Sequence, residues 1–141
     1  MKVRALLADR RIVLLGQLVI GLLFLASALS KIGEAGAFAR QIHYYRLVPL
    51  GLENLLAIIL PWIELTTALA ILLRLQPRAG AAVGAGLMAL FTVVVAAAVT
   101  RGLDIECGCF GTADATRVGV AKLLENLGLV AVALLGCQRP R

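Results

Sequence analysis

The stretch AGAAVGAGLMALFTVVVAAAVT, residues 79–100, contains no charged side chain. A transmembrane helix needs about 20 consecutive apolar residues to cross about 30 Å of hydrocarbon, and this stretch is long enough. Three further apolar runs give helices at about residues 12–32, 53–73 and 117–137. The sequence therefore predicts an all-α membrane protein, a four-transmembrane-helix bundle that forms one domain over residues 1–141.

The composition supports a lipid environment for this bundle. Hydrophobic residues make up 61% of the chain and the mean hydropathy is +0.95, whereas a soluble domain is roughly 45–50% apolar. A domain this small keeps much of its surface exposed, so a soluble fold could not hide the excess. The lipid bilayer is the first partner that the sequence predicts.

The net charge of +6 raises the possibility of nucleic-acid binding. The basic residues lie at the ends of the apolar runs, however, and not on one face among aromatic side chains. Basic residues in these positions anchor and orient helices in a bilayer. We therefore exclude nucleic acid as a partner.

The first apolar run, residues 12–29, also resembles a secretory signal peptide. It follows a basic tail, and Ala26-Ser27-Ala28 fits a cleavage site. The run is longer than the apolar region of a typical signal peptide. We interpret it as a transmembrane helix.

A short helix in the membrane interface is predicted between the first two transmembrane helices, within residues 34–47. Its apolar side chains fall on one helical face, which is typical of a helix lying in the interface plane. Tyr44 and Tyr45 suit an interfacial position, and Pro49 is expected to end the helix. The apolar face comprises Ala35, Phe38, Ile42 and Tyr45.

The distribution of Lys and Arg predicts the orientation. The amino tail, the 74–78 turn and the carboxyl tail hold 8 of these residues. The other two loops, counted with the helix ends beside them, hold 6, which are Lys31, Arg40, Arg46, Arg101, Arg117 and Lys122. Because cytoplasmic loops carry the excess, both termini are expected in the cytoplasm. In the inner membrane of a bacterium, the loop of residues 101–117 would then face the oxidising periplasm.

That loop contains Cys107-Gly-Cys109, the strongest chemical signal in the chain. Gly tolerates backbone angles that allow a small disulfide ring, and strained, exposed disulfides are the more oxidising ones. The pair is interpreted as a dithiol that cycles. A permanent staple and a metal site with His43 are alternatives, although two Cys alone make an incomplete zinc set, and we predict no metal. Cys137 is expected to be a packed thiol.

Glu64 is the second signal. It lies eleven residues after Glu53, or about 16 Å along a helix, near the middle of the predicted second span. A charge there costs on the order of 3 kcal/mol, so Glu64 should face the bundle and is a functional candidate by default. Pro61 removes a helical hydrogen bond one turn earlier. The alternative role is an anchor to the first helix, through Ser27, Ser30 or Gln17.

Four motifs follow one another with recognisable spacing: LLFLASALSK at residues 22–31, YRLVP at 45–49, LPWIEL at 60–65 and CGCFG at 107–111. In order and spacing they resemble the methylamine-utilisation MauE family, within the wider DoxX-like membrane proteins. The resemblance covers nearly the whole chain.

This resemblance implies a thiol–disulfide accessory protein that works with a periplasmic thioredoxin-like partner. The partners would mature an exported, methylamine dehydrogenase-like protein. Cys107 and Cys109 would be the redox pair, with Pro61, Trp62 and Glu64 as an intramembrane signature. If the protein is catalytic, it would be an oxidoreductase-like relay. The chain has no second cysteine pair, so such a relay would need a quinone or the thiols of a partner.

Two other functions remain open at this stage. Four short helices with one buried carboxylate, Glu64, also describe a small transporter. An assembly scaffold without redox chemistry would use the cysteines only to staple the loop.

Overall fold

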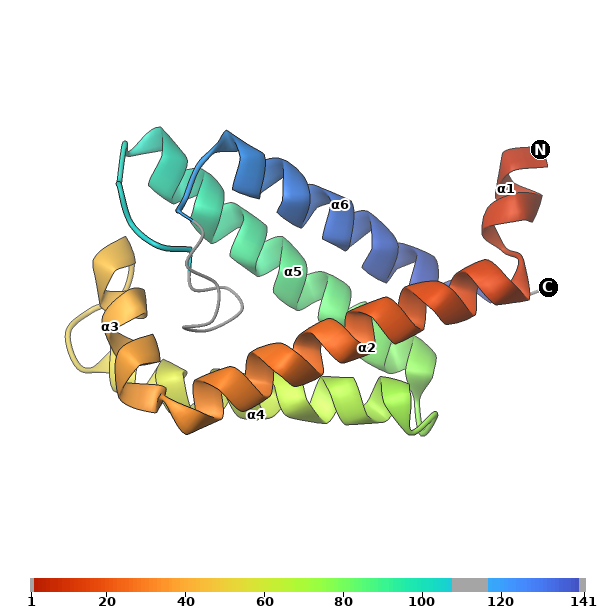
Figure 1. The fold of residues 1–141 in the computed structure, drawn as a ribbon, viewed down its shortest axis with the longest axis horizontal. Helices are drawn as coiled ribbons and strands as arrows, with labels where there is room; N and C mark the ends of the chain where they lie inside the picture. The colour runs from red at the N-terminus through yellow and green to blue at the C-terminus, as the bar shows by residue number, and fades with distance from the viewer. Residues whose placement is uncertain (1, 108–116, 140–141) are drawn as a thin grey trace.

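The computed structural model describes residues 2–107 and 117–139. The described part is built from α-helices (Figure 1). The helices are α1 (Lys2–Leu7), α2 (Arg10–Gly33), α3 (Ala35–Tyr45), α4 (Leu52–Leu72), α5 (Pro77–Thr100) and α6 (Val120–Gly136). The predicted all-α class is confirmed, and each predicted transmembrane segment coincides with one long helix to within a few residues.

Three of the helices are long and apolar enough to cross a membrane. These are α2, α4 and α5, with mean hydropathies of 2.5, 2.2 and 2.4 over their most apolar windows. The helix α6 has 17 residues, or about 25 Å at the usual rise per residue. Its predicted role as the fourth span stays a prediction.

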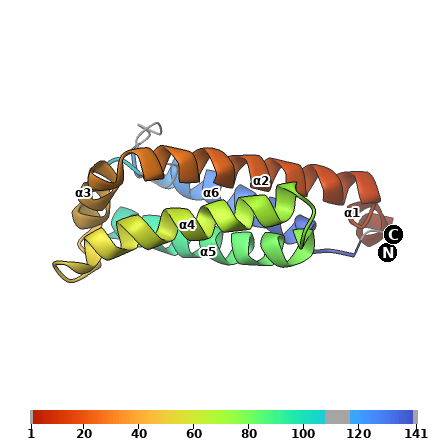
Figure 2. The ribbon, with the colours of Figure 1, turned by 90° about the horizontal axis from the view of Figure 1, so that it is seen from below.

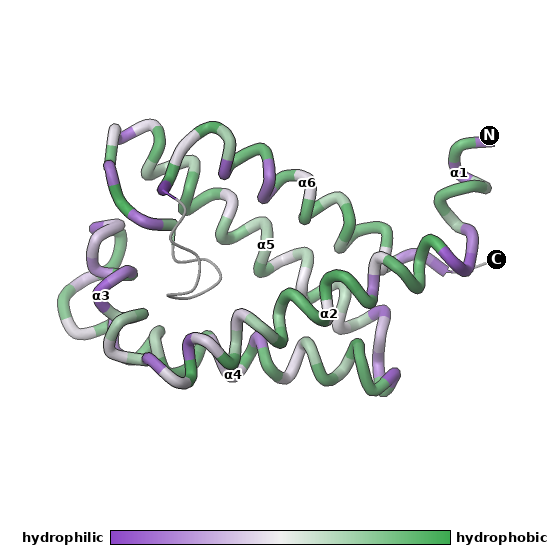
Figure 3. The backbone as a smooth tube through the Cα atoms, in the orientation of Figure 1, coloured by the Kyte–Doolittle hydropathy of each residue, from purple (hydrophilic) through white to green (hydrophobic). Residues whose placement is uncertain are grey.

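The long helices run up and down beside one another (Figures 1 and 2). The helix α2 packs mainly on α4 and α6, while α5 packs on α6 and α4. Hydrophobic residues cover the helices along their length, and hydrophilic residues gather toward the helix ends and connecting segments (Figure 3). Many large apolar side chains on the outside, such as Val93 at 65% exposure, suit contact with lipid.

Two glycines let α5 lie close to its neighbours. A Cβ atom at Gly84 would lie 3.1 Å from the ring of Phe24 on α2. At Gly80 it would lie 2.7 Å from the side chain of Ile71 on α4. This small-residue spacing is typical of closely packed membrane helices.

Polar contacts join three helices at the end of the bundle where both termini lie. Gln17 Nε2 donates to the carbonyl of Gly136 at 2.8 Å, and Arg74 Nη1 donates to Gln17 Oε1 at 2.7 Å. Arg78 Nε donates to the carbonyl of Cys137 at 3.4 Å. We call these three contacts the terminal clamp, because they hold α2 and α6 to the α4–α5 turn and to the first turn of α5.

The helix α3 lies across the opposite end of the bundle (Figures 1 and 2). Its buried residues include Phe38, Gln41 and Tyr45. The prediction that Pro49 ends this helix is wrong, because Arg46 already adopts a left-handed conformation with φ of 53°. The interfacial depth of α3 stays a prediction, whereas Tyr45 is 7% exposed and packs inward.

Candidate functional site

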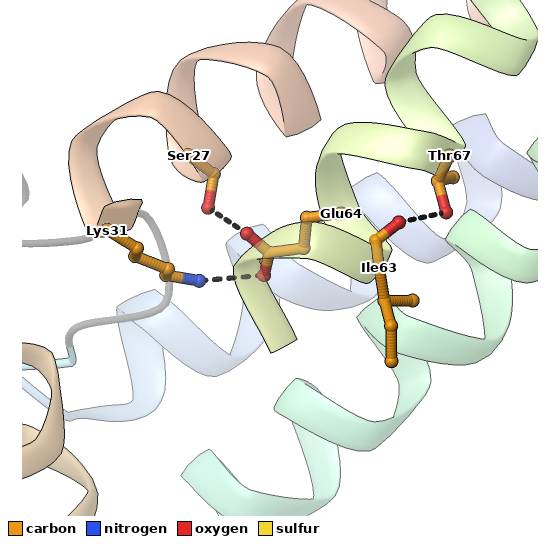
Figure 4. A network of polar contacts seen from close by, with 5 residues as sticks. All are labelled: Ser27, Lys31, Ile63, Glu64 and Thr67. Atoms are coloured by element: carbon orange, nitrogen blue, oxygen red, sulfur yellow. Dashed lines mark hydrogen bonds and ion pairs between the residues drawn. The ribbon is translucent and has the colours of Figure 1, made fainter. Parts of the chain in front are cut away.

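A buried ion pair joins the middle of α4 to the last two turns of α2 (Figure 4). Lys31 Nζ donates to Glu64 Oε1 at 2.7 Å, and Ser27 Oγ donates to Glu64 Oε2 at 2.9 Å. The Lys31 and Glu64 side chains are both 0% exposed. Each carboxylate oxygen therefore has a donor, which is what a buried charge requires.

The local sequence explains how these groups meet. Ser27 and Lys31 are four residues apart, so they lie on one face of α2. Pro61 is buried within α4, one turn before Glu64, and the helix continues through it. One turn after Ile63, the Thr67 hydroxyl donates to the Ile63 carbonyl at 2.8 Å (Figure 4). Between Pro61 and Thr67, Glu64 is the one buried residue, and its carboxylate meets Ser27 and Lys31 of α2.

The inward orientation of Glu64 agrees with the prediction from the sequence, and Ser27 is one of the three anchors that the alternative role offered. Lys31 was missed as a partner, because it was counted among the charges of a loop. Its spacing of four from Ser27 was the available signal. Gln17, the other candidate anchor, instead belongs to the terminal clamp. Trp62 is 54% exposed and points away from the buried pair.

Two aromatic rings complete the surroundings of Lys31. Its Nζ lies 4.7 Å from the ring centroid of Phe38 on α3 and 4.9 Å from that of Phe91 on α5. A cation at such distances is attracted to the ring faces, more strongly where water is excluded. The ammonium group thus connects α2, α3, α4 and α5.

Cys107 is held beneath α3. Its side chain belongs to the core and the residue is 2% exposed. The hydroxyl of Tyr45 donates to the Cys107 carbonyl, and Arg101 Nη1 donates to the Tyr45 carbonyl at 2.7 Å. We expected an exposed loop with both thiols outward. For Cys107 that expectation is wrong, and Cys109 lies outside the described residues.

The two ends of the cysteine loop meet in a short antiparallel bridge between Glu106 and Arg117. Val118 N donates to the carbonyl of Ile105 at 2.8 Å. Arg117, which precedes α6, also donates to the exposed Asp104 carboxylate, and this hydrogen bond raises the pKa of the Arg117 guanidinium. The base of the loop is therefore fixed from both sides.

An apolar cavity of about 220 Å³ lies beside Cys107. It is lined by α3, α4, α5 and the segments that follow α3 and α5. Phe38 and Phe91 belong both to this lining and to the surroundings of Lys31. The lining residues are Phe38, Ile42, Tyr45, Leu47, Val48, Leu56, Leu60, Leu90, Phe91, Val94 and Cys107.

Two other predicted residues, His43 and Cys137, are not in the lining of this cavity. His43 Nδ1 lies 2.7 Å from Glu53 Oε1 and ties α3 to the start of α4. The half-buried Cys137 donates from Sγ to the carbonyl of Ala133 at 3.3 Å, as a packed thiol would. Within residues 2–107 and 117–139, no group of three or more His, Cys, Asp or Glu side chains could hold a metal ion.

The chain is similar in sequence to one protein family and to several known proteins. A family model described as "Methylamine utilisation protein MauE" matches residues 9–139. Methylamine utilization protein MauE of Methylophilus methylotrophus is 31% identical over 89% of this chain and 67% of its own length. The protein of the same name from Paracoccus denitrificans is 31% identical over 84% of this chain and 64% of its own length.

A third relative, MauE of Methylorubrum extorquens, is 30% identical over 93% of this chain and 71% of its own length. The chain thus spans about two thirds of the length of these relatives. No solved structure matches the chain significantly. With nearly the whole sequence inside the family model and relatives of at least 30% identity, this chain belongs to the MauE family.

Proposed function

We propose that this chain is an accessory protein of methylamine utilisation that exchanges disulfides in the bacterial inner membrane. Its partner is a periplasmic thioredoxin-like protein. The protein that the two partners mature is an exported, methylamine dehydrogenase-like protein. Membership of the MauE family supports the pathway. The Cys107-Gly-Cys109 motif supports the chemistry.

The observation that carries the proposal is the position of Cys107. It is 2% exposed, anchored through its carbonyl by Tyr45, and lies in the wall of a cavity. A staple between two solvent-exposed thiols would need no such fixed position. We assign Cys107 as the inner thiol and Cys109 as the thiol that the partner attacks.

The exchange balances without any further reagent. One thiolate of the reduced partner attacks Cys109 in the Cys107–Cys109 disulfide, and Cys107 leaves as a thiolate. The second thiol of the partner then resolves the mixed disulfide, so that the partner is oxidised and the chain is reduced. Exchange through such an intermediate is general for protein thiols. The reverse sequence would serve a reducing pathway.

Trapping of the mixed disulfide tests the assignment. Cys107→Ser leaves Cys109 without its resolving neighbour, so we expect it to accumulate a mixed disulfide with the thioredoxin-like partner. Of the pair, Cys109→Ser leaves only the buried thiol of Cys107, so we expect this variant to form little mixed disulfide with the partner. Non-reducing gels of membranes from cells that make both proteins give the measurement, and Cys137→Ser is the matched control that should behave as the unmodified chain.

Trapping by Cys109→Ser instead of Cys107→Ser would reverse the two roles. If neither variant forms a mixed disulfide and both support dehydrogenase maturation, the scaffold function replaces exchange. A transporter that uses Glu64 receives less support. The carboxylate is bound by Lys31 and Ser27 and does not line the cavity.

A further inference from the structure

The cavity beside Cys107 indicates which kind of molecule accepts its electrons, and this inference rests on the proposed disulfide exchange. An exchange protein that oxidises its partner must pass two electrons onward. The chain has three cysteines; Cys137 belongs to the terminal clamp, whereas Cys107 is held by Tyr45 of α3. No second pair is therefore present in the chain to receive these electrons. The acceptor must reach Cys107 from outside the chain.

The lining restricts what can enter. Among the described residues, every lining side chain is apolar apart from those of Tyr45 and Cys107, and the Tyr45 hydroxyl already donates to a carbonyl. A charged ligand would lose its hydration beside these residues without a compensating partner. Lys31 is not one of the described lining residues, and its ammonium group is bound to Glu64. The ligand is therefore neutral.

The volume restricts the size of the ligand. A cavity of about 150 Å³ lined by Leu, Ile and Phe binds benzene, so about 220 Å³ holds one substituted six-membered ring. Sites for larger, drug-sized ligands begin at about 300 Å³. A nicotinamide or flavin nucleotide is too large and too charged for this space.

The position of the cavity restricts where the ligand comes from. Three of the lining leucines, Leu47, Leu56 and Leu90, are 47%, 37% and 51% exposed on the outside of the bundle. Leu56 and Leu90 belong to helices that are apolar enough to span a membrane. The rim is therefore apolar where it meets the outside, and a ligand dissolved in the hydrocarbon would reach it directly.

We propose that this cavity binds the ring of a lipid-soluble quinone, which accepts the electrons of Cys107 and Cys109. Two S–H bonds break and one S–S bond forms. The two electrons and two protons pass to the two carbonyl oxygens of the quinone, giving the hydroquinone. No other reactant is needed. Cys107, which lines the cavity, delivers the electrons to the ring, and Cys109 serves the protein partner.

The test uses the full chain, reduced and placed in lipid nanodiscs without oxygen, with a short-chain ubiquinone as the probe. We expect one hydroquinone to form per chain, measured by absorbance. The two thiols of the pair should be lost together, measured by maleimide gel shift. Val94→Phe fills the cavity and should slow this reaction about tenfold or more. Val93→Phe, the matched control, adds the same ring on the exposed neighbouring position and should leave the rate unchanged.

A water-soluble oxidant, diamide, separates damage to the thiols from loss of the quinone site. Val94→Phe should react with diamide as fast as the unmodified chain. If Val94→Phe and Val93→Phe reduce the quinone equally fast, or if no hydroquinone forms, the cavity is no quinone site. A lipid acyl chain would then be its occupant. Mixed-disulfide trapping by Cys107→Ser in that case keeps disulfide exchange and overturns only the quinone assignment, whereas loss of trapping overturns the exchange itself.

Discussion

At the scale of single residues, the Lys31–Glu64 pair carries a large desolvation cost, because both side chains are 0% exposed. Two charges without exposed surface lose their hydration, and their mutual attraction offsets this loss only when the remaining hydrogen-bonding capacity is also used. Ser27 and the two phenylalanine rings contribute to that compensation. The pair fixes how α2 meets α4, and it supports the wall of the cavity through Phe38 and Phe91.

We therefore predict opposite outcomes for single and double replacements of this pair. Glu64→Leu or Lys31→Met alone leaves an uncompensated buried charge, which costs about 3–5 kcal/mol of unfolding free energy. The combination of both changes should recover most of that loss, since apolar residues of similar volume often replace buried pairs at no cost. Unfolding of the purified variants in detergent, titrated with dodecyl sulfate, gives the comparison.

Activity of the double variant separates an anchor from a chemical group. A folded double variant that still supports dehydrogenase maturation assigns Glu64 as an anchor. A folded but inactive one gives the carboxylate a role in the reaction. A loss of stability in the double variant equal to the sum of the two single losses would show that the pair contributes no coupling.

The sequence predicted the burial of Glu64 correctly, because a lone carboxylate inside an apolar run has few acceptable positions. Lys31 was harder to place. A lysine at the end of an apolar run usually reaches the interface, and its enclosure here depends on Phe38 of α3 and Phe91 of α5. The burial of Cys107 likewise depends on the packing of α3 against the bundle. Its anchor, Tyr45, is 62 positions away in the sequence, and no local pattern encodes that contact.

At the scale of elements, α3 controls access to Cys107. It contributes Phe38, Ile42 and Tyr45 to the cavity wall, and Tyr45 also holds the cysteine segment through its hydroxyl. The backbone carbonyl of Tyr45 in turn accepts a hydrogen bond from Arg101, which follows the end of α5. A helix first predicted from its amphipathic pattern thus serves as the cover of the candidate site.

Removal of the Tyr45 hydroxyl should loosen this cover. Tyr45→Phe deprives the Cys107 carbonyl of its donor, and an unmet buried hydrogen bond costs about 1–3 kcal/mol. In a chain where Cys107 is the only cysteine, we expect the rate of maleimide labelling to rise about tenfold. Tyr44→Phe, on the exposed face of α3, is the matched control. Equal labelling rates for the two variants would mean that Tyr45 does not restrain the segment.

At the scale of the whole molecule, the structure changes the charge count behind the predicted orientation. Lys31 and Lys122 were counted on the side of the cysteine loop, but they are 1% and 3% exposed. Lys31 is bound to Glu64, and Lys122 Nζ lies 3.3 Å from Glu125 Oε1. Without them that side keeps 4 of the 14 basic residues, against 8 on the side of the termini. The bias toward cytoplasmic termini becomes stronger.

Labelling of intact cells tests this orientation. Two single-cysteine chains are compared, one that keeps only Cys109 and one that carries only Val3→Cys on α1. A membrane-impermeant maleimide should label the Cys109 chain at once. The Val3→Cys chain should be labelled only after the membrane is made permeable. The reverse pattern would place the cysteine loop in the cytoplasm, where disulfides are rarely maintained.

The terminal clamp has a counterpart at the other end of the bundle. Gln17, Arg74 and Arg78 bridge α2, α6, the α4–α5 turn and the first turn of α5. Beneath α3, the Lys31–Glu64 pair joins α2 to α4, and the Tyr45 hydroxyl holds the Cys107 carbonyl. The lining of the cavity beside Cys107 is apolar, and apolar contacts can slide without leaving a polar group unsatisfied. The polar contacts therefore act as fixed struts, and the cavity wall is the part of the bundle that can yield when a ring enters.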